Sequence, residues 1–160
     1  MSNPKAVLIT GGAGFIGSHL AEKLVALGDK VFVLDDLSTG SMDNIRHLMP
    51  NKSFVFKKGS VLNRPLVRKM TEGMDEVYHL AAAVGVQVIM DKPLDSLILN
   101  TQGTEIMLDA VEGRKIPIML ISTSEIYGKN TKLPFREEDD RVYGSAYNYR
   151  WGYAFSKGID

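Results

Sequence analysis

The 160-residue sequence contains no cysteine and three histidines, and these shortages exclude several classes of protein. Without cysteine there is neither a disulfide framework nor a thiolate metal site. The histidines His19, His47 and His79 show no ligand spacing, so we expect no metal. Basic and acidic side chains both number 19, so the formal net charge is zero and gives no indication of a nucleic-acid partner.

Long apolar runs are also missing. No stretch approaches the roughly 18 apolar residues that a membrane span needs, and the first residues lack the pattern of a signal peptide. We therefore expect a cytoplasmic protein with no membrane partner. The hydrophobic content of 44% is sufficient for a core, and no repeat or linker interrupts the chain, so we expect one domain over residues 1–160.

Short β-branched runs alternate with segments of helical periodicity along the chain. This alternation predicts the α/β class, with a doubly wound parallel sheet of the Rossmann type. The predicted strands are Lys5–Thr10, Lys30–Asp35, Ser53–Gly59, Asp75–Ala82 and Ile116–Thr123, and the predicted helices are Phe15–Gly28, Met42–Leu48, Pro93–Val111 and a last one from about Arg150.

A glycine-rich loop, Gly11-x-x-Gly14-x-x-Gly17, lies between the first predicted strand and helix. Glycines in this context permit a tight turn, a close approach of a pyrophosphate and close packing of helix on strand, and the helix N-terminus offers N–H groups to phosphates. Asp35 ends the next strand about 20 residues on, where a carboxylate can bind an adenosine ribose. Because that carboxylate would repel a 2′-phosphate, we predict NAD rather than NADP.

A second motif, Tyr153-x-x-x-Lys157, places a phenol and an ammonium one helical turn apart. The ammonium favours the phenolate, so the pKa of the tyrosine falls from its ordinary value near 10 and the phenolate can act as a general base toward a sugar hydroxyl. The hydroxyl side chains of Ser122, Thr123 and Ser124, together with Glu125, lie at the C-terminal end of the fifth predicted strand, at the edge of the sheet where ligands bind. They can hold an oxygen that becomes a carbonyl.

The sequence resembles the extended short-chain dehydrogenase/reductase family, in particular its NAD-dependent nucleotide-sugar epimerases and dehydratases. The resemblance covers nearly the whole chain and rests on TGGAGFIGSHL, LDDLSTG, VYHLAA, NTQGTEIMLDA, STSEIYG and YAFSK, in the family's order and spacing.

The resemblance implies a role for each matching residue. Thr123 corresponds to the catalytic Ser or Thr, Tyr153 to the base, and Lys157 to the partner of the base, which also holds the nicotinamide ribose. The implied NAD-binding residues are Gly11, Gly14, Phe15, Ile16 and Gly17 at the pyrophosphate, Asp35 with Asp36, Leu37, Ser38 and Gly40 at the adenosine ribose, Ser60 and Val61 at the adenine, Leu80, Ala81 and Ala82 along the cleft, and Asn100 behind it. At Ser60 the family usually has Asp, so the expected bond to adenine is weaker here.

The family's reactions share a first step, in which Tyr153 takes the proton of the sugar C4 hydroxyl while hydride passes to NAD. The dTDP-glucose 4,6-dehydratases carry Asp-Glu after the catalytic Thr, where this chain has Ser124-Glu125. This difference disfavours 4,6-dehydration. Thr-Ser-Glu resembles UDP-glucuronate decarboxylases and GDP-mannose dehydratases, but the latter use NADP, which Asp35 argues against. The loop AAAVGVQV (Ala81–Val88) is closer to UDP-glucose and UDP-glucuronate 4-epimerases. The sequence favours a UDP-sugar 4-epimerase acting on UDP-glucose or UDP-glucuronate, with UDP-glucuronate decarboxylase or a nucleotide-sugar 4,6-dehydratase as the alternatives.

Family members extend well beyond this length, so we expect the C-terminal substrate domain to be absent from this chain. For the isolated chain we expect poor positioning of Tyr153 and Lys157, no activity, and weak or absent NAD binding by calorimetric titration. A natural chain ending at Asp160 would instead be a non-catalytic NAD-binding module. The resemblance also implies a possible homodimer, through a four-helix bundle formed by the Pro93–Val111 helix and the terminal helix.

Overall fold

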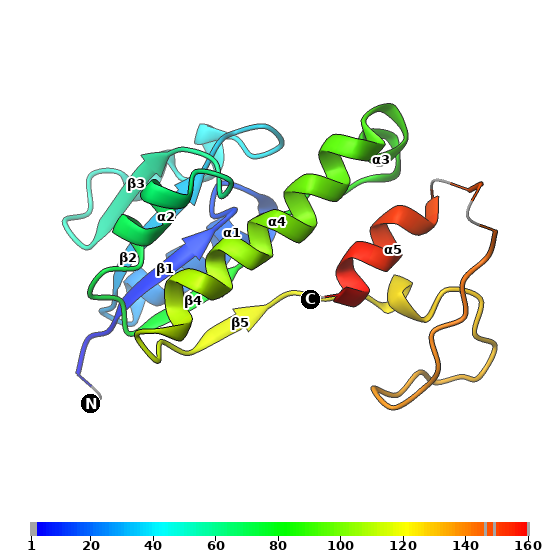
Figure 1. Ribbon diagram of the computed structural model, residues 1–160. Coiled ribbons are helices and arrows are strands. Elements are labelled where there is room, and N and C mark those ends of the chain that lie inside the picture. Colours follow the sequence, from blue (N-terminus) through cyan, green and yellow to red (C-terminus); the bar gives the residue numbers. More distant parts are fainter. Residues whose placement is uncertain (1–2, 146, 149, 160) are drawn as a thin grey trace. The chain divides into compact units, whose positions relative to one another are not determined.

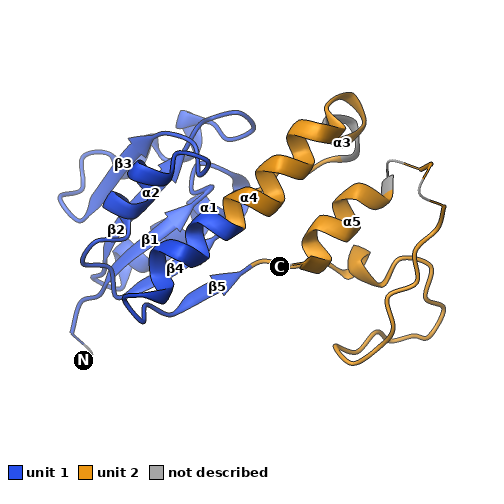
Figure 2. Cartoon of the chain, in the orientation of Figure 1, with its two compact units in different colours: residues 1–81, 105–120 blue, residues 82–104, 121–160 orange. Residues whose placement is uncertain are grey.

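The computed structural model of the chain describes residues 3–145, 147, 148 and 150–159, without the side chains of residues 86–88 and 150. The chain forms two compact units, coloured separately in Figure 2. Unit 1 comprises residues 1–81 and 105–120, and unit 2 comprises residues 82–104 and 121–160. Helix α4 (Pro93–Glu112) begins in unit 2 and ends in unit 1.

Unit 1 contains a parallel sheet, which has five strands in the described part of the chain (Figure 1). Its order is β3-β2-β1-β4-β5, and every neighbouring pair is parallel. This topology confirms the predicted Rossmann-type fold. The strands are β1 (Ala6–Thr10), β2 (Lys30–Asp35), β3 (Phe54–Lys58), β4 (Glu76–His79) and β5 (Ile118–Leu120).

Four of these strands are shorter than predicted, β4 and β5 most of all. The ladder between β4 and β5 begins at the pair Val77 and Ile118 and ends at the pair His79 and Leu120. A strand at this end of the sheet can extend only as far as its neighbour offers backbone groups. The length of β5 is therefore set by β4, and the sequence of β5 alone does not reveal this limit.

The predicted helix at Met42–Leu48 was wrong in type. This segment forms two 3₁₀ turns, η1 (Met42–Asn44) and η2 (Arg46–Leu48), because the backbone of Ile45 has φ −122° and ψ 0° and interrupts a continuous helix.

Two helices were missed: α2 (Arg64–Met70) and α3 (Val86–Asp91). Helix α2 carries a recognisable start, because the side chain of Asn63 accepts a hydrogen bond from the N–H of Leu66 at 3.1 Å and Pro65 lies in the first turn.

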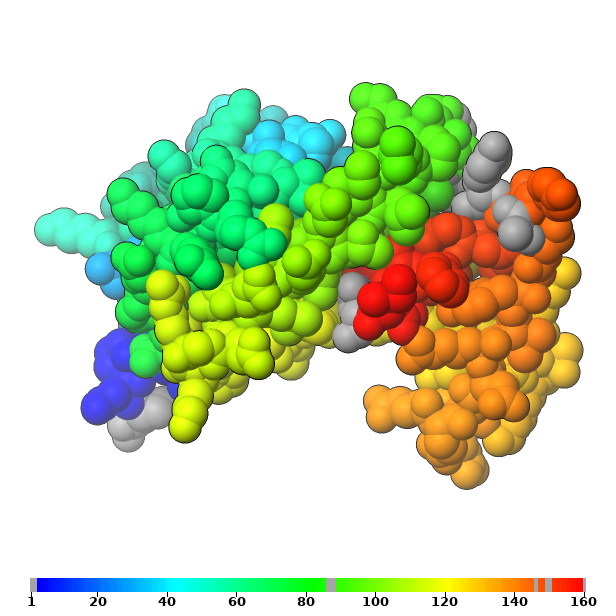
Figure 3. Space-filling view, in the orientation of Figure 1, coloured from blue at the N-terminus to red at the C-terminus, as the bar shows by residue number. Residues whose placement is uncertain are grey.

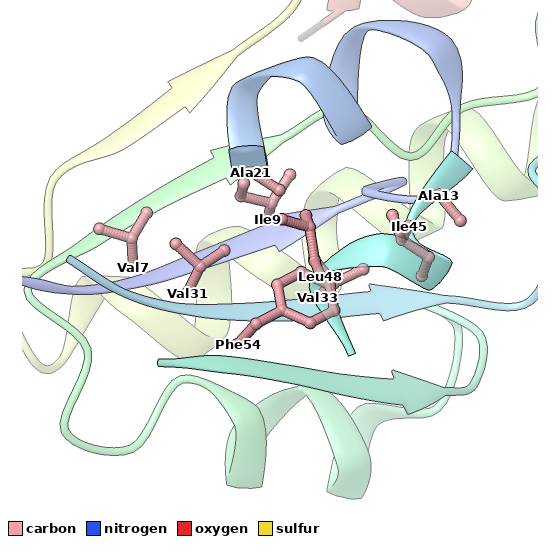
Figure 4. Packing of buried hydrophobic residues seen from close by; sticks show 9 residues of the cluster. All are labelled: Val7, Ile9, Ala13, Ala21, Val31, Val33, Ile45, Leu48 and Phe54. Atoms are coloured by element: carbon pink, nitrogen blue, oxygen red, sulfur yellow. The ribbon is translucent and has the colours of Figure 1, made fainter. Parts of the chain in front are cut away.

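One cluster of buried hydrophobic residues in unit 1 lies on one face of the sheet (Figure 4). Val7 and Ile9 of β1 alternate with residues of the opposite face, and Val31 and Val33 of β2 lie beside them in register. Helix α1 (Phe15–Ala26) covers this face and contributes Ala21. Its predicted C-terminal end is confirmed, since Gly28 follows with φ +94°.

Helix α2 covers the other face. A Cβ atom placed on Gly59 would lie 2.4 Å from Leu66 of α2 and 3.4 Å from Leu34 of β2, so these two leucines meet there. Arg64 of α2 pairs with Asp109 and Glu105 on the part of α4 that belongs to unit 1. Helices therefore lie on both faces of the sheet, as a doubly wound fold requires.

Unit 2 contains α3, the first part of α4, the 3₁₀ turn η3 (Ser124–Tyr127) and helix α5 (Arg150–Ile159). Helix α5 packs against η3 and against α3. It also reaches the surface, as its red segment in Figure 3 shows. Its side chains Phe155 and Ile159 are exposed. Between η3 and α5 the chain forms a long loop that comes back to η3. There the N–H of Val142 donates to the carbonyl of Tyr127 at 3.2 Å.

An ion pair stabilises the loop between η3 and α5. Lys132 pairs with Asp139, whose carboxylate is nearly inaccessible to solvent and also accepts from the backbone N–H of Arg136 at 2.8 Å. The hydrogen bond from Lys132 is the largest cause of a lowered pKa at Asp139, and the N–H of Arg136 acts in the same direction.

Removing the cation should therefore raise the pKa of Asp139. A carboxyl group with a lowered folded-state pKa stabilises the fold above its unfolded-state pKa, and that contribution is lost as the pH falls through the folded value. We expect Lys132→Met to move the Asp139 titration, followed by carboxyl carbon NMR, toward its ordinary value of 3.8. Lys132→Arg should leave it low, and an unchanged midpoint in Lys132→Met would contradict this account.

Candidate cofactor and catalytic site

The glycine loop of unit 1 brings backbone segments together more closely than side chains allow. Gly11 has φ +69°, and its N–H donates to the carbonyl of Leu34 at 2.9 Å. A Cβ atom on Gly11 would lie 2.8 Å from the backbone nitrogen of Ala81. Both the positive φ and this close approach require glycine. The predicted residues Leu80 and Ala81 therefore do lie against the loop.

Gly17 allows helix α1 to begin directly on the loop. A Cβ atom there would lie 2.4 Å from the carbonyl oxygen of Gly11. Gly14 caps α1 and, within the described residues, no side chain caps that end. The exposed Phe15 and Ile16 form the first turn. The close contacts around Gly11 and Gly17 and the open helix N-terminus together fit a bound pyrophosphate.

Asp35 fixes the loop from the end of β2. One oxygen of its buried carboxylate accepts from the N–H of Ala13 at 2.9 Å, and the other accepts from the N–H of Leu37 at 2.8 Å. Each carboxylate oxygen can accept a further bond, so the predicted contact with a ribose diol remains chemically open.

The segment after Asp35 folds back onto Ala13. The carbonyl of Ala13 accepts from the N–H of Ser41 at 3.1 Å and from the side chain of Asn44 at 2.8 Å. A Cβ atom on Gly40 would lie 2.9 Å from the carbonyl carbon of Ala13. Asp36 accepts from the N–H of Ser38 at 2.9 Å and stabilises the same turn. Asn44 was not among the predicted residues.

Ser60 lies next to Asp35, because the N–H of the preceding Gly59 donates to the carbonyl of Asp35 at 3.0 Å. The hydroxyl of Ser60 accepts from the N–H of Leu62 at 3.2 Å, which forms a local turn, and Val61 is buried. The contact of Ser60 and Val61 with adenine stays a prediction.

A buried pair of side chains holds the end of β4 against the end of β1. The hydroxyl of Thr10 lies 2.7 Å from Nδ1 of His79 and accepts from the N–H of Ala81 at 3.2 Å. Thr10 and His79 therefore determine where Ala81 lies beside Gly11. We had assigned no function to either residue from the sequence.

The predicted catalytic residues belong to unit 2. Thr123 precedes η3, and its hydroxyl accepts from the N–H of Glu125 at 3.3 Å, so it caps that turn. Ser124 and Glu125 are exposed on η3. Tyr153 and Lys157 lie one turn apart on α5, as predicted, with Tyr153 partly buried and Lys157 only 6% exposed. Because α5 packs against η3, the two segments that carry the predicted catalytic residues are in contact.

Asn100 of α4 is buried and bonded to the protein within unit 2. Its Oδ1 accepts from the N–H of Ala83 at 2.7 Å, and its Nδ2 donates to the carbonyl of Ala83 at 3.4 Å and to the hydroxyl of Ser156 at 3.3 Å. Asn100 thus connects α5 to the residue after Ala82. Its predicted place behind the NAD cleft, like that of Ala82, stays a prediction. In the predicted loop Ala81–Val88, the side chains at 86–88 lie outside the described residues.

Two further searches cover only the residues that the structure describes. Among them, no group of three or more His, Cys, Asp or Glu side chains could hold a metal ion. In the same residues, no helix combines the length and the apolar character that crossing a membrane requires.

Residues 8–159 match the family model described as GDP-mannose 4,6 dehydratase. The chain belongs to this family. It is 40% identical over 156 residues to a UDP-N-acetyl-alpha-D-glucosaminuronate decarboxylase of Bacillus cytotoxicus, and the match covers 98% of this chain and 48% of that protein. The chain therefore spans about half the length of this curated relative.

Two solved structures of similar proteins extend the comparison. A UDP-N-acetylglucosamine 4-epimerase from Methanobrevibacter ruminantium superimposes with a TM-score of 0.86 at 29% identity, over 99% of this chain and 48% of that one. The dTDP-glucose 4,6-dehydratase DesIV from Streptomyces venezuelae gives 0.85 at 29% identity, over 96% of this chain and 48% of that one. DesIV was solved with NAD bound, which agrees with the cofactor that Asp35 predicts.

The close contacts of Gly17 generate a test of the cofactor site. In the full-length protein, Gly17→Ala should push the loop away from α1, at a cost of about 1–3 kcal/mol, and should weaken NAD binding by about tenfold or more in a calorimetric titration. Gly113→Ala is the matched control, because a Cβ atom there meets nothing within 4 Å. If both variants bound NAD like the wild type, Gly17 would not shape the site.

Proposed function

We propose that the full-length protein oxidises a UDP-sugar at C4 with bound NAD, and that its reaction is the decarboxylation of a UDP-hexuronate. The observation that carries this proposal is the Thr123-Ser124-Glu125 segment on η3, packed against the helix that carries Tyr153 and Lys157. The Bacillus cytotoxicus decarboxylase, 40% identical over nearly all of this chain, supports the same reading.

The first step is assigned to α5. Tyr153 accepts the proton of the sugar C4 hydroxyl, and the ammonium of Lys157, one turn away, stabilises the phenolate. NAD, which the glycine loop and Asp35 would hold, would supply the hydride acceptor for C4 and the donor for its return. The hydroxyl of Thr123 donates a hydrogen bond to the C4 oxygen as that oxygen becomes a carbonyl.

The second step explains why a carboxylate at C6 matters. Once C4 is a ketone, the C6 carboxylate belongs to a β-keto acid, so the C5–C6 bond breaks, carbon dioxide leaves and the electron pair forms an enolate at C4. A proton must then reach C5, and Ser124 and Glu125 are the groups that follow Thr123 on η3. Tyr153 finally returns its proton to the C4 oxygen when hydride returns to C4.

The second candidate is 4-epimerisation of a UDP-sugar. The loop that begins at Ala81 resembles that of UDP-sugar 4-epimerases, and the Methanobrevibacter ruminantium 4-epimerase has a very similar fold. Epimerisation uses the same first step, after which the keto-sugar turns and receives hydride on its other face. Glu125 would then position backbone or water instead of moving a proton to C5.

Product analysis separates the two reactions. The full-length protein should be incubated with UDP-glucuronate, UDP-N-acetylglucosaminuronate and UDP-glucose, with proton NMR of the sugar. We expect a uronate to lose C6 and give a pentose or its N-acetylated analogue. A gluco-to-galacto change at C4 with all carbons kept would replace the proposal by epimerisation, and no change in any sugar would refute both.

The roles proposed for the residues of η3 and of α5 predict that substitutions in the two segments impair different steps of the reaction. Tyr153→Phe should lower hydride transfer by about 10²–10⁴-fold, since the general base is lost. Glu125→Gln or Ser124→Ala should leave hydride transfer and the loss of carbon dioxide intact but slow the protonation of C5, so that NADH absorbance accumulates and the final sugar forms slowly. Glu137→Gln is the control, because it removes an exposed carboxylate elsewhere in unit 2. A wild-type rate of final product formation in both η3 variants would exclude a proton-transfer role for these side chains.

A further inference from the structure

Ser156 lies between Tyr153 and Lys157 on α5 and is completely buried. Its hydroxyl donates to the backbone carbonyl of Tyr153 at 2.9 Å. Because a hydroxyl has a single proton, the contact with Nδ2 of Asn100 at 3.3 Å must have the amide of Asn100 as its donor. The bonds therefore run in one direction, from Asn100 through Ser156 to the backbone of Tyr153.

The same amide holds a second segment. Asn100 bonds both backbone groups of Ala83, as a neighbouring strand would, with its Oδ1 only 2.7 Å from the N–H. Asn100 is 3% exposed, and Ala83 is buried as well. In such surroundings a polar group left without its partner costs more than the bond itself contributes, so the network favours a single arrangement.

We propose that Ser156 is a positioning residue for the reaction: together with Asn100 it fixes the turn of α5 that carries Tyr153 to the Ala83 segment. The proposal rests on the proposed function, in which Tyr153 is the base. It assigns no contact between Ser156 and the sugar.

The simpler explanation is that Ser156 only satisfies its own hydroxyl, since serine often bonds the carbonyl three residues earlier in a helix. Thr104 of α4 makes the related bond to the carbonyl four residues earlier, with its hydroxyl 2.9 Å from the carbonyl of Asn100. Ser156 differs because its oxygen also accepts from another helix, and because the carbonyl that it binds belongs to Tyr153.

The decisive experiment compares Ser156→Ala with wild type in the full-length protein. The rate of hydride transfer is followed by NADH absorbance in a single turnover with UDP-glucuronate. We expect the rate to fall by about tenfold to a hundredfold while the affinity for the sugar changes by less than about twofold, because a displaced base impairs chemistry more than binding. Asn100→Ala should have a similar effect, and the double variant should be no slower than the slower single variant.

Thr71→Ala is the control for a purely structural effect. Thr71 is fully buried in unit 1, and its hydroxyl bonds the carbonyls of Val67 and Arg68. We expect it to lower Tm without slowing hydride transfer. Wild-type hydride transfer in Ser156→Ala, or additive losses in the double variant, would overturn the proposal.

Hydrogen exchange of the α5 backbone amides tests the positioning without any substrate. We expect faster exchange in Ser156→Ala than in Thr71→Ala, and equal exchange would overturn the proposal. If the wild type converted no sugar, the proposed function would fail on its own, and the exchange result would still decide whether Ser156 holds α5.

Discussion

The carboxylate of Asp35 is the contact on which unit 1 depends most. It joins the end of β2 to the glycine loop through the N–H of Ala13, and to the following turn through the N–H of Leu37. Hydrogen bonds to a charged group contribute roughly 1.5–3 kcal/mol each. Ala13 in turn accepts from Ser41 and Asn44, so both loops at this edge form one surface. In the proposed function, the same carboxylate holds the loops and recognises the ribose.

Sequence periodicity was enough to predict the fold class and the glycine loop, because both depend on local patterns. Other features depend on bonds between residues far apart in the chain: 31 residues separate Asn44 from Ala13, and 56 separate Asn100 from Ser156. No local pattern identifies such partners. The missed helices α2 and α3 have 7 and 6 residues, too few for hydrophobic periodicity to stand out.

The segments of unit 2 that carry the predicted catalytic residues are short, and their positions come from tertiary bonds. Helix α5 has 10 residues, a length at which an isolated helix is marginal in water. Besides the bond from Asn100, the hydroxyl of Tyr143 donates to the carbonyl of Ala154 at 3.3 Å, and Arg141 donates to the carbonyl of Gly158. The arrangement of Tyr153 and Lys157 therefore depends on residues outside α5.

The choice between decarboxylation and epimerisation depends on the substrate as well as on the protein. Both reactions pass through a 4-keto sugar, and only a sugar with a C6 carboxylate becomes a β-keto acid at that point. An acidic side chain at position 124 would repel that carboxylate, whereas the neutral hydroxyl of Ser124 can donate a hydrogen bond to it. In the proposed function, Ser124 therefore suits a uronate substrate better than the Asp that dTDP-glucose 4,6-dehydratases carry at this position.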